Sequence, residues 1–138
     1  MAGTTAYNLQ IVTPEGHAFV GEVRSVVLPG ADGSFGILAT HAPLLSALQV
    51  GTLEMEDASG NRETWAIGEG FVEVVAEGTK VLTDFTNKAG EVDVPRAEAA
   101  RERAQQLLDQ SLETTDRARA EAAMRRAMLR LRLSGKTS

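Results

Sequence analysis

Apolar positions in the first two thirds of the chain come in short stretches that are separated by turn residues. Glycine, asparagine, aspartate and serine, which tolerate φ > 0 or bond to nearby backbone, lie between the stretches. Short strands at this spacing are typical of a sandwich or barrel. Residues 52–56 alternate cleanly between polar and apolar side chains, so one sheet face is expected to meet solvent. The predicted strands are 9–13, 20–28, 35–38, 52–56, 64–67, 71–76 and 81–85.

The pattern changes near residue 91, where β-branched residues and glycines give way to alanine, arginine, glutamate and leucine. This composition favours helix. Asp93 is predicted to be the N-cap, with Pro95 in the first turn, where its missing N–H breaks no helical bond. The first helix is expected to run to about Gln110, and a second from Asp116 to Leu133. The short polar break between them predicts an antiparallel hairpin.

The predicted hairpin has apolar stripes at helical spacing that consist mostly of alanine. An alanine methyl buries little surface, so the hairpin is expected to be marginally stable, with alternative positions separated by only about a few kcal/mol. The stripes are Ala100, Ala104, Leu107 and Leu108 on the first helix, and Ala120, Ala123, Ala127, Met128 and Leu131 on the second. The predicted fold is therefore an N-terminal antiparallel β-sandwich, residues 1–90, followed by a C-terminal antiparallel two-helix arm, residues 91–138.

Charge divides the chain at nearly the same place. Residues 1–92 carry four basic and twelve acidic side chains, a net charge of −8, whereas residues 93–138 carry ten basic and seven acidic ones, a net charge of +3. Between residues 117 and 136 there are seven basic side chains and one acidic side chain, Glu121. This asymmetry predicts an arm that docks on an acidic surface.

Composition excludes several classes of function. The chain has no cysteine, and its two histidines, His17 and His41, lack the spacing of a metal site. No nucleophile elbow or paired acid–base site occurs, and the glycines of residues 30–36 lack the lysine and hydroxyl of a phosphate loop. The acidic pI near 5.0 argues against nucleic acid as a partner. No apolar run reaches the ~20 residues of a membrane span. Taken together, these observations predict a non-catalytic protein that holds no metal and does not insert into a membrane.

Residues 28–45, LPGADGSFGILATHAPLL, resemble the most recognisable segment of the epsilon subunit of bacterial F-type ATP synthases, which is homologous to the mitochondrial delta subunit. Residues 9–14, 65–73 and 81–84 and the helical tail follow in the order of that family. One departure is Ala39-Thr40, where the family usually has Pro-Gly. The resemblance therefore covers nearly the whole chain.

The resemblance implies a non-catalytic subunit of the central stalk of a proton-translocating ATP synthase. The sandwich would contact the gamma subunit and the c-ring, with Ser34 and His41 at the ring-contact positions. The arm would inhibit ATP hydrolysis by docking on the alpha and beta catalytic subunits. The protein would lie peripherally at the cytoplasmic face of the bacterial plasma membrane. The arginines implied in docking on beta are Arg125, Arg126, Arg130 and Arg132.

A nucleotide motif overlaps the start of the arm. Residues 92–97 match the pattern [Ile/Leu]-Asp-x-x-Arg-Ala with which bacterial epsilon subunits bind ATP, with valine at the first position. A turn near residue 113 would set Arg96 opposite Arg130 and Arg103 close to Arg126, a cluster suited to a triphosphate. In the simpler interpretation Arg96 pairs with Asp93 and the other arginines stay solvated or serve docking. The candidate nucleotide residues are Val92, Asp93, Arg96, Ala97, Arg103, Arg126 and Arg130.

The two interpretations of the arm lead to two functions. If the arginines serve docking, the protein is a coupling subunit that requires no cofactor, and ATP is at most its regulatory ligand. If the arginines bind nucleotide, the protein is a free-standing nucleotide-sensing module that binds ATP with the helical hairpin. Both assign the arginines of the arm to anion recognition.

Overall fold

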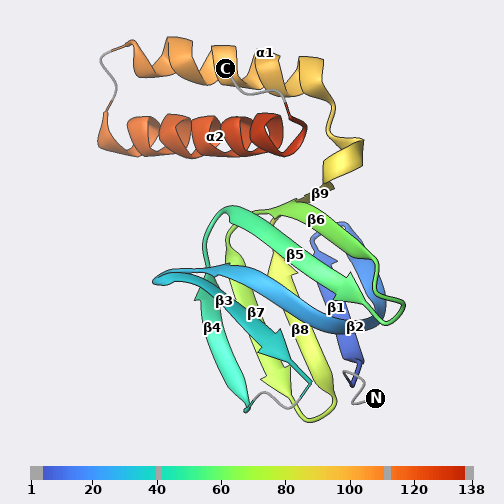
Figure 1. Cartoon of the computed structure of the whole chain (residues 1–138). Helices are drawn as coiled ribbons and strands as arrows, with labels where there is room; N and C mark the ends of the chain where they lie inside the picture. Colours follow the sequence, from blue (N-terminus) through green and yellow to red (C-terminus); the bar gives the residue numbers. More distant parts are fainter. Residues whose placement is uncertain (1–4, 40–41, 111–112, 136–138) are drawn as a thin grey trace. The chain divides into compact units, whose positions relative to one another are not determined.

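The computed structural model describes residues 5–39, 42–110 and 113–135 (Figure 1). The chain divides into two compact units, Met1–Thr86 and Asn87–Ser138. The strands lie in the first unit, apart from the last residues of a short strand that spans the boundary, and the helices lie in the second. The predicted fold class, a β-sandwich followed by a two-helix hairpin, is confirmed.

The first unit is built from eight strands, and a ninth short strand spans the boundary between the units. The strands are β1 (Tyr7–Thr13), β2 (Gly16–Gly30), β3 (Gly33–Leu38), β4 (Leu44–Leu48), β5 (Gly51–Asp57), β6 (Arg62–Ile67), β7 (Gly70–Val75), β8 (Gly78–Thr83) and β9 (Thr86–Lys88). All seven predicted strands are present, with ends shifted by a few residues. The strands β4 and β9 were not predicted.

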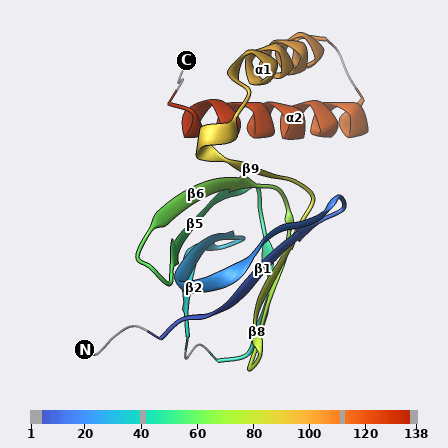
Figure 2. The same cartoon turned by 90° about the vertical axis from the view of Figure 1, so that its right-hand side faces the viewer.

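The strands form two layers that share β2 (Figure 2). The first half of β2 pairs antiparallel with β1, and its second half pairs with β3 and β5. One layer has the order β1-β8-β7-β4, in which β1 and β8 are parallel and the other pairs antiparallel. The other layer contains β3, the second half of β2, β5 and β6. Sharing one long strand allows a domain of this size to enclose a core with few free edges.

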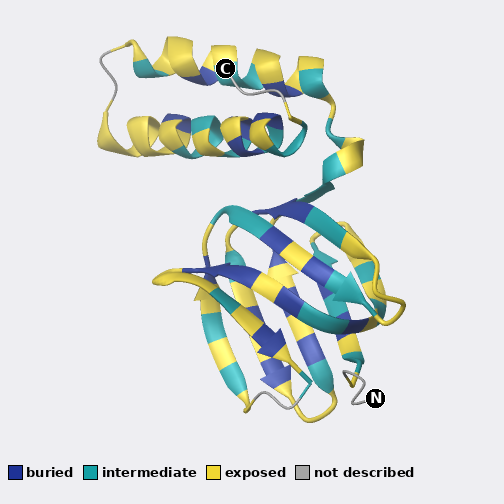
Figure 3. Cartoon of the chain, in the orientation of Figure 1, coloured by how far each residue is buried: buried dark blue, intermediate teal, exposed yellow. Residues whose placement is uncertain are grey.

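The core lies between the layers, and buried residues alternate with exposed ones along the strands (Figure 3). Strand β8 shows the period of two, because Thr79, Val81 and Thr83 are buried while Lys80 and Leu82 are exposed. The predicted solvent-facing alternation of residues 52–56 is also present. The largest fully buried side chains are Leu9, Ile11, Leu28, Ile37, Leu53, Ile67, Val23, Val26, Val72 and Val81.

A tight hairpin joins β2 to β3. Gly30 pairs with Gly33, and Gly33 has φ +121°, a left-handed conformation that favours glycine. Close to this strand, the hydroxyl of Tyr7 donates a hydrogen bond of 2.6 Å to the carbonyl oxygen of Ile37. Partial burial raises the pKa of Tyr7 above its ordinary value. This hydrogen bond links β1 to β3 through a neutral phenol.

The second unit contains a short 3₁₀ helix, η1 (Ala89–Glu91), and the helices α1 (Val94–Leu108) and α2 (Thr114–Leu133). Asp93 is the N-cap of α1, because its Oδ1 accepts a hydrogen bond of 3.1 Å from the backbone N–H of Arg96. Pro95 occupies the first turn, as predicted. The two helices lie side by side (Figure 1), which confirms the predicted hairpin.

Small residues form the buried stripe of each helix. Ala97 and Ala104 are buried on α1, and Ala120 and Ala127 on α2. Each pair is seven residues apart and so lies on one face of its helix. Leu129 and Leu131 are buried as well. Two residues that were predicted to belong to the buried stripes are exposed instead, Leu107 by 44% and Met128 by 39%. The stripe is therefore narrower than predicted and richer in alanine.

Candidate functional site

The outward side chains of the β1-β8-β7-β4 layer include a row of apolar residues that crosses all four strands. The pairing places Ala47 beside Phe71, Phe71 beside Leu82, and Leu82 beside Val12. Phe71 is 53% and Leu82 44% exposed. We call these four residues, Ala47, Phe71, Leu82 and Val12, the apolar row. Leu45, which is 71% exposed, lies on the same sheet face beside Glu73. Exposed apolar side chains grouped in this way make this sheet face a candidate interaction site.

A shallow depression of ≈ 400 Å³ continues the apolar row at its β1 end. Its floor and walls are mainly apolar, and two carboxylates stand among the lining residues. The depression has room for a partner's apolar side chain, and the carboxylates favour a neighbouring basic one. The apolar lining residues include Val12, Pro14, Phe71 and Leu82, and the two carboxylates are Glu69 and Asp84.

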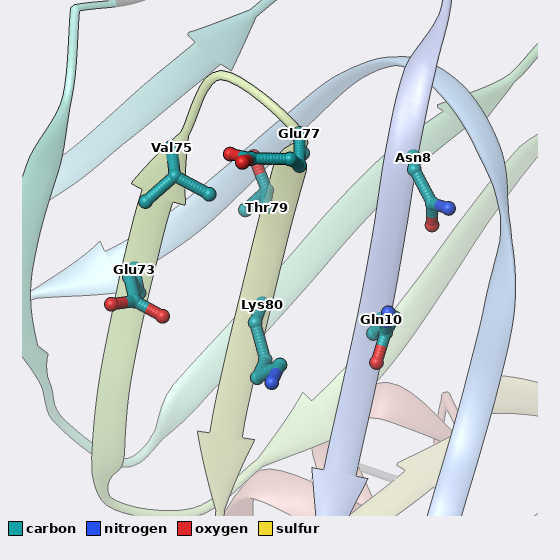
Figure 4. Close-up of a pocket in the computed structure, with 8 residues that line it drawn as sticks. Asn8, Gln10, Glu73, Val75, Glu77, Thr79 and Lys80 are labelled. Atoms are coloured by element: carbon teal, nitrogen blue, oxygen red, sulfur yellow. The ribbon is translucent and has the colours of Figure 1, made fainter.

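A polar row runs beside the apolar row and opens into a second, smaller hollow (Figure 4). Register sets Glu73 opposite Lys80 and Lys80 opposite Gln10. The volume of ≈ 190 Å³ is below the roughly 300–1,000 Å³ that is typical of small-molecule sites. This hollow suits hydrogen bonding at the edge of a protein interface better than capture of a ligand.

One of the two predicted c-ring contacts, Ser34, lies within the described residues. Ser34 is exposed near the start of the strand, next to the β2–β3 turn. His41 lies outside the described residues. Ser34 is therefore available to a partner, and its role in contacting a c-ring stays a prediction.

The nucleotide motif has a structural role of its own at the start of α1. Asp93 caps the helix through the backbone of Arg96, and the Arg96 side chain is exposed. Ala97 is buried within the helical unit. Val92, the C-cap of η1, is half-buried. Capping and packing thus account for the aspartate and the alanine, and nucleotide binding by these residues stays a prediction.

The arginines of the arm fall into two sets. Arg125 and Arg132 are exposed and seven residues apart, so they share one face of α2. Arg126 and Arg130 are half-buried and four residues apart. Arg103 on α1 is exposed. The predicted beta-docking arginines therefore do not all lie on one open face.

The predicted pairing of Arg96 with Arg130, and of Arg103 with Arg126, across the hairpin stays a prediction.

Asn87 makes a tertiary contact that the sequence did not predict. Its Oδ1 accepts a hydrogen bond of 2.6 Å from Nε of Arg130, across 43 positions of sequence. The sequence pattern also did not reveal the apolar row, because Ala47 lies on the unpredicted strand β4 and the members on predicted strands were counted only as strand formers. Cross-strand register was the information that the sequence pattern lacked.

Metal binding and membrane insertion can each be compared with the described residues. No group of three or more His, Cys, Asp or Glu side chains in ranges 5–39, 42–110 and 113–135 is arranged to hold a metal ion. Among the same residues, no helix is both long enough and apolar enough to cross a membrane.

Comparison with known proteins gives one consistent result. Residues 6–89 match the family described as ATP synthase, Delta/Epsilon chain, beta-sandwich domain, and residues 91–135 match its long alpha-helix domain. The ATP synthase epsilon chain of Syntrophomonas wolfei is 41% identical over 136 residues, which cover 99% of this chain and 98% of that protein. The epsilon chain of Desulforamulus reducens is 44% identical over 124 residues, 90% of this chain and 93% of that protein.

Solved structures show the same fold. A chain in the cryo-EM structure of the Euglena gracilis mitochondrial ATP synthase, OSCP/F1/c-ring, aligns with a TM-score of 0.74 at 23% identity, covering 91% of this chain and 81% of that one. A chain from the central stalk/c-ring structure of the Tetrahymena thermophila enzyme aligns with a TM-score of 0.67 at 15% identity, covering 96% and 99%.

Proposed function

The chain belongs to the delta/epsilon family of ATP synthase subunits, which are non-catalytic, and on that premise we propose that it couples the gamma subunit of the central stalk to the c-ring. The apolar row is the observation that supports this proposal. A coupling subunit must transmit torque, so it needs an interface that does not slip. A rigid sheet face with large exposed apolar side chains provides one.

The gamma subunit is the partner we assign to the apolar row. The depression beside Phe71 and Leu82 accepts an apolar side chain, and Glu69 and Asp84 at its rim complement a basic one. Ser34 lies on the other layer, and we assign it to contact with the c-ring. Two partners on different parts of the sandwich are what a subunit between a shaft and a ring requires.

The arm is assigned to regulation. We expect the exposed pair Arg125 and Arg132 to dock on an acidic surface of the catalytic subunits and so restrain ATP hydrolysis. Met128, exposed between them on the same helix, adds an apolar contact to that face. The protein acts at the cytoplasmic face of the bacterial plasma membrane, where it is held through its partners.

The coupling proposal is tested by changing one residue of the apolar row. Phe71→Glu places a charge in the centre of the row, and we expect the full chain to lose at least tenfold in affinity for purified gamma, as measured by calorimetry or copurification. Val27→Glu, on the other layer and 37% exposed, is the matched control. Equal loss in both variants, or none in Phe71→Glu, contradicts the assignment of the row to gamma.

Regulation is tested separately in the assembled enzyme. Arg125→Glu with Arg132→Glu should raise the ATPase rate of the reconstituted complex several-fold without changing the amount of subunit that assembles. Arg117→Glu with Arg119→Glu, at the exposed start of the same helix, controls for total charge. An ATPase rate that responds equally in both double variants means that the Arg125/Arg132 face has no specific role.

A further inference from the structure

We propose that a hollow at one end of the sandwich binds an aliphatic diamine, a flexible apolar chain that carries an ammonium group at each end. The hollow has a volume of ≈ 400 Å³, which falls within the roughly 300–1,000 Å³ of small-molecule sites. It lies where β1 begins, where β3 ends and where a turn joins β7 to β8 (Figure 1). The described residues that line it all belong to the first unit, so the site is part of the sandwich.

The charge of this hollow favours a cation. Glu22 and Glu77 contribute carboxylates, and the described lining residues include no lysine, arginine or histidine. Neither carboxylate has an ion pair or a side-chain hydrogen bond within the described part of the chain. Tyr7, which also lines the hollow, stays neutral because burial raises its pKa above the ordinary value. Two free negative charges are therefore available to a positively charged ligand.

The two carboxylates come from either side of Asn8, which suits a ligand with two charges. Strand β1 pairs with β2 on one side, where Asn8 lies opposite Glu22, and with β8 on the other. Glu77 directly precedes Gly78, the first residue of β8, where an added Cβ would meet the Asn8 carbonyl oxygen at 2.7 Å. Two strand spacings, about 10 Å, separate β2 from β8. A short methylene chain between two ammonium groups can bridge the two carboxylates, because the glutamate side chains cover part of this span.

Thr79 supplies a second, independent observation that points to a ligand. The residue is only 3% exposed, yet its hydroxyl has no hydrogen bond within the described residues. Thr79 lines this hollow and also the ≈ 190 Å³ hollow of Figure 4. Since no unpartnered polar side-chain atom is fully enclosed in the described ranges, the hydroxyl is reached from these hollows. A hydroxyl oxygen in this position can accept a hydrogen bond from an ammonium group, which has three donors and no acceptor.

The apolar lining matches the methylene chain of the ligand. Val74 is buried beneath the hollow, while Val75 and Leu38 expose apolar surface to it. The hydroxyl of Tyr7 is bound to the Ile37 carbonyl oxygen, which fixes the position of the aromatic ring. An aromatic face attracts a cation. The hollow thus combines apolar and aromatic surface with acidic groups, as an amphipathic cation requires.

Chemical-shift titration of the isotope-labelled full chain with cadaverine, a five-carbon diamine, tests the site at low and constant ionic strength. We expect saturable shifts of the backbone amides of Asn8, Glu77 and Thr79, with the amides of β5 and β6 unchanged. Pentylamine has the same carbon chain but one ammonium group. It should bind about three- to fivefold more weakly, which is the range for one ion pair that water can reach.

Matched variants separate the site from the net charge of the sandwich. Glu77→Gln removes one carboxylate and should weaken cadaverine binding about three- to fivefold. Glu73→Gln removes the same charge from the same β7–β8 hairpin, at a position that lines only the smaller hollow, and should leave affinity within about twofold. Thr79→Val keeps the shape of the side chain without its hydroxyl and should also weaken binding several-fold. Trp65 fluorescence in urea verifies that each variant remains folded.

Absence of a saturable shift at these amides would overturn the proposal. Equal loss of affinity in Glu73→Gln and Glu77→Gln would do so as well, because the ligand would then respond to net charge alone. Equal affinity for cadaverine and pentylamine would show that Glu22 and Glu77 do not act together on one ligand. None of these measurements involves gamma or the c-ring, so their outcome is independent of the coupling function proposed above.

Discussion

The two units of this chain are stabilised by different means. The sandwich buries leucine, isoleucine and valine side chains completely, including Leu9, Ile37 and Leu53, whereas the buried stripes of the helices are mainly alanine. Burying a leucine is worth about 2–3 kcal/mol, and an alanine methyl far less. The difference indicates a rigid unit that suits a permanent interface and a labile unit that suits a switch.

The largest expected effect lies in the sandwich core. Leu53→Ala removes a fully buried side chain from β5, and its loss plus the cavity left behind should lower the free energy of unfolding by about 2–5 kcal/mol. Trp65, the single tryptophan, pairs with Leu53 across β5 and β6 and reports this unfolding by fluorescence in urea. A loss below about 1 kcal/mol would contradict the account of a close-packed core.

Adding side-chain volume, rather than removing it, tests the packing between α1 and α2. Ala127→Leu forces a large side chain into a buried alanine position of α2 and should destabilise the hairpin by about 1–3 kcal/mol through overpacking. Circular dichroism at the helical band measures the hairpin while Trp65 fluorescence follows the sandwich. Ala118→Leu, at an exposed position of the same helix, is the control. A more stable hairpin in Ala127→Leu would mean that the interface between α1 and α2 is loosely packed.

A smaller effect is expected at the start of α1. Asp93→Ala removes the acceptor that caps Arg96 N–H and should cost about 1 kcal/mol of helix stability. Asp93→Asn keeps a side-chain oxygen at the cap and should restore most of the loss. Thermal melts at the helical band compare the three chains. Equal loss in both variants would assign the effect of Asp93 to its charge rather than to its cap.

The link from β1 to β3 predicts a pH dependence of the sandwich. Tyr7→Phe removes the hydrogen bond to Ile37 and should cost about 0.5–1.5 kcal/mol. Burial raises the pKa of Tyr7, so the unfolded chain releases the phenolic proton first. The stability that Tyr7 contributes is therefore complete below the ordinary pKa of about 10 and declines as pH rises above it.

Urea unfolding at a series of alkaline pH values measures this decline. Tyr7 is the single tyrosine of the chain, so tyrosinate absorbance reports its ionisation directly. Tyr7→Phe should be less sensitive to pH above about 10 than the parent chain. If parent and variant lose stability in parallel, Tyr7 is not the titrating group that matters.

The sequence by itself determined the division of the chain and the type of each element. Period-two alternation, turn glycines such as Gly33, and the cap at Asp93 act within a few residues of chain, so their consequences are visible in the sequence. The switch to alanine and arginine near residue 91 likewise follows from local helix propensity.

Tertiary structure decided which surfaces and contacts those elements produce. Strand β4 pairs with β7, about 27 residues further along, and that register aligns Ala47 with Phe71 and Leu82 in one row. The bond from Arg130 to Asn87 joins positions 43 apart. Such partners are fixed by the packing of the whole unit, because no local propensity depends on a residue that distant in sequence.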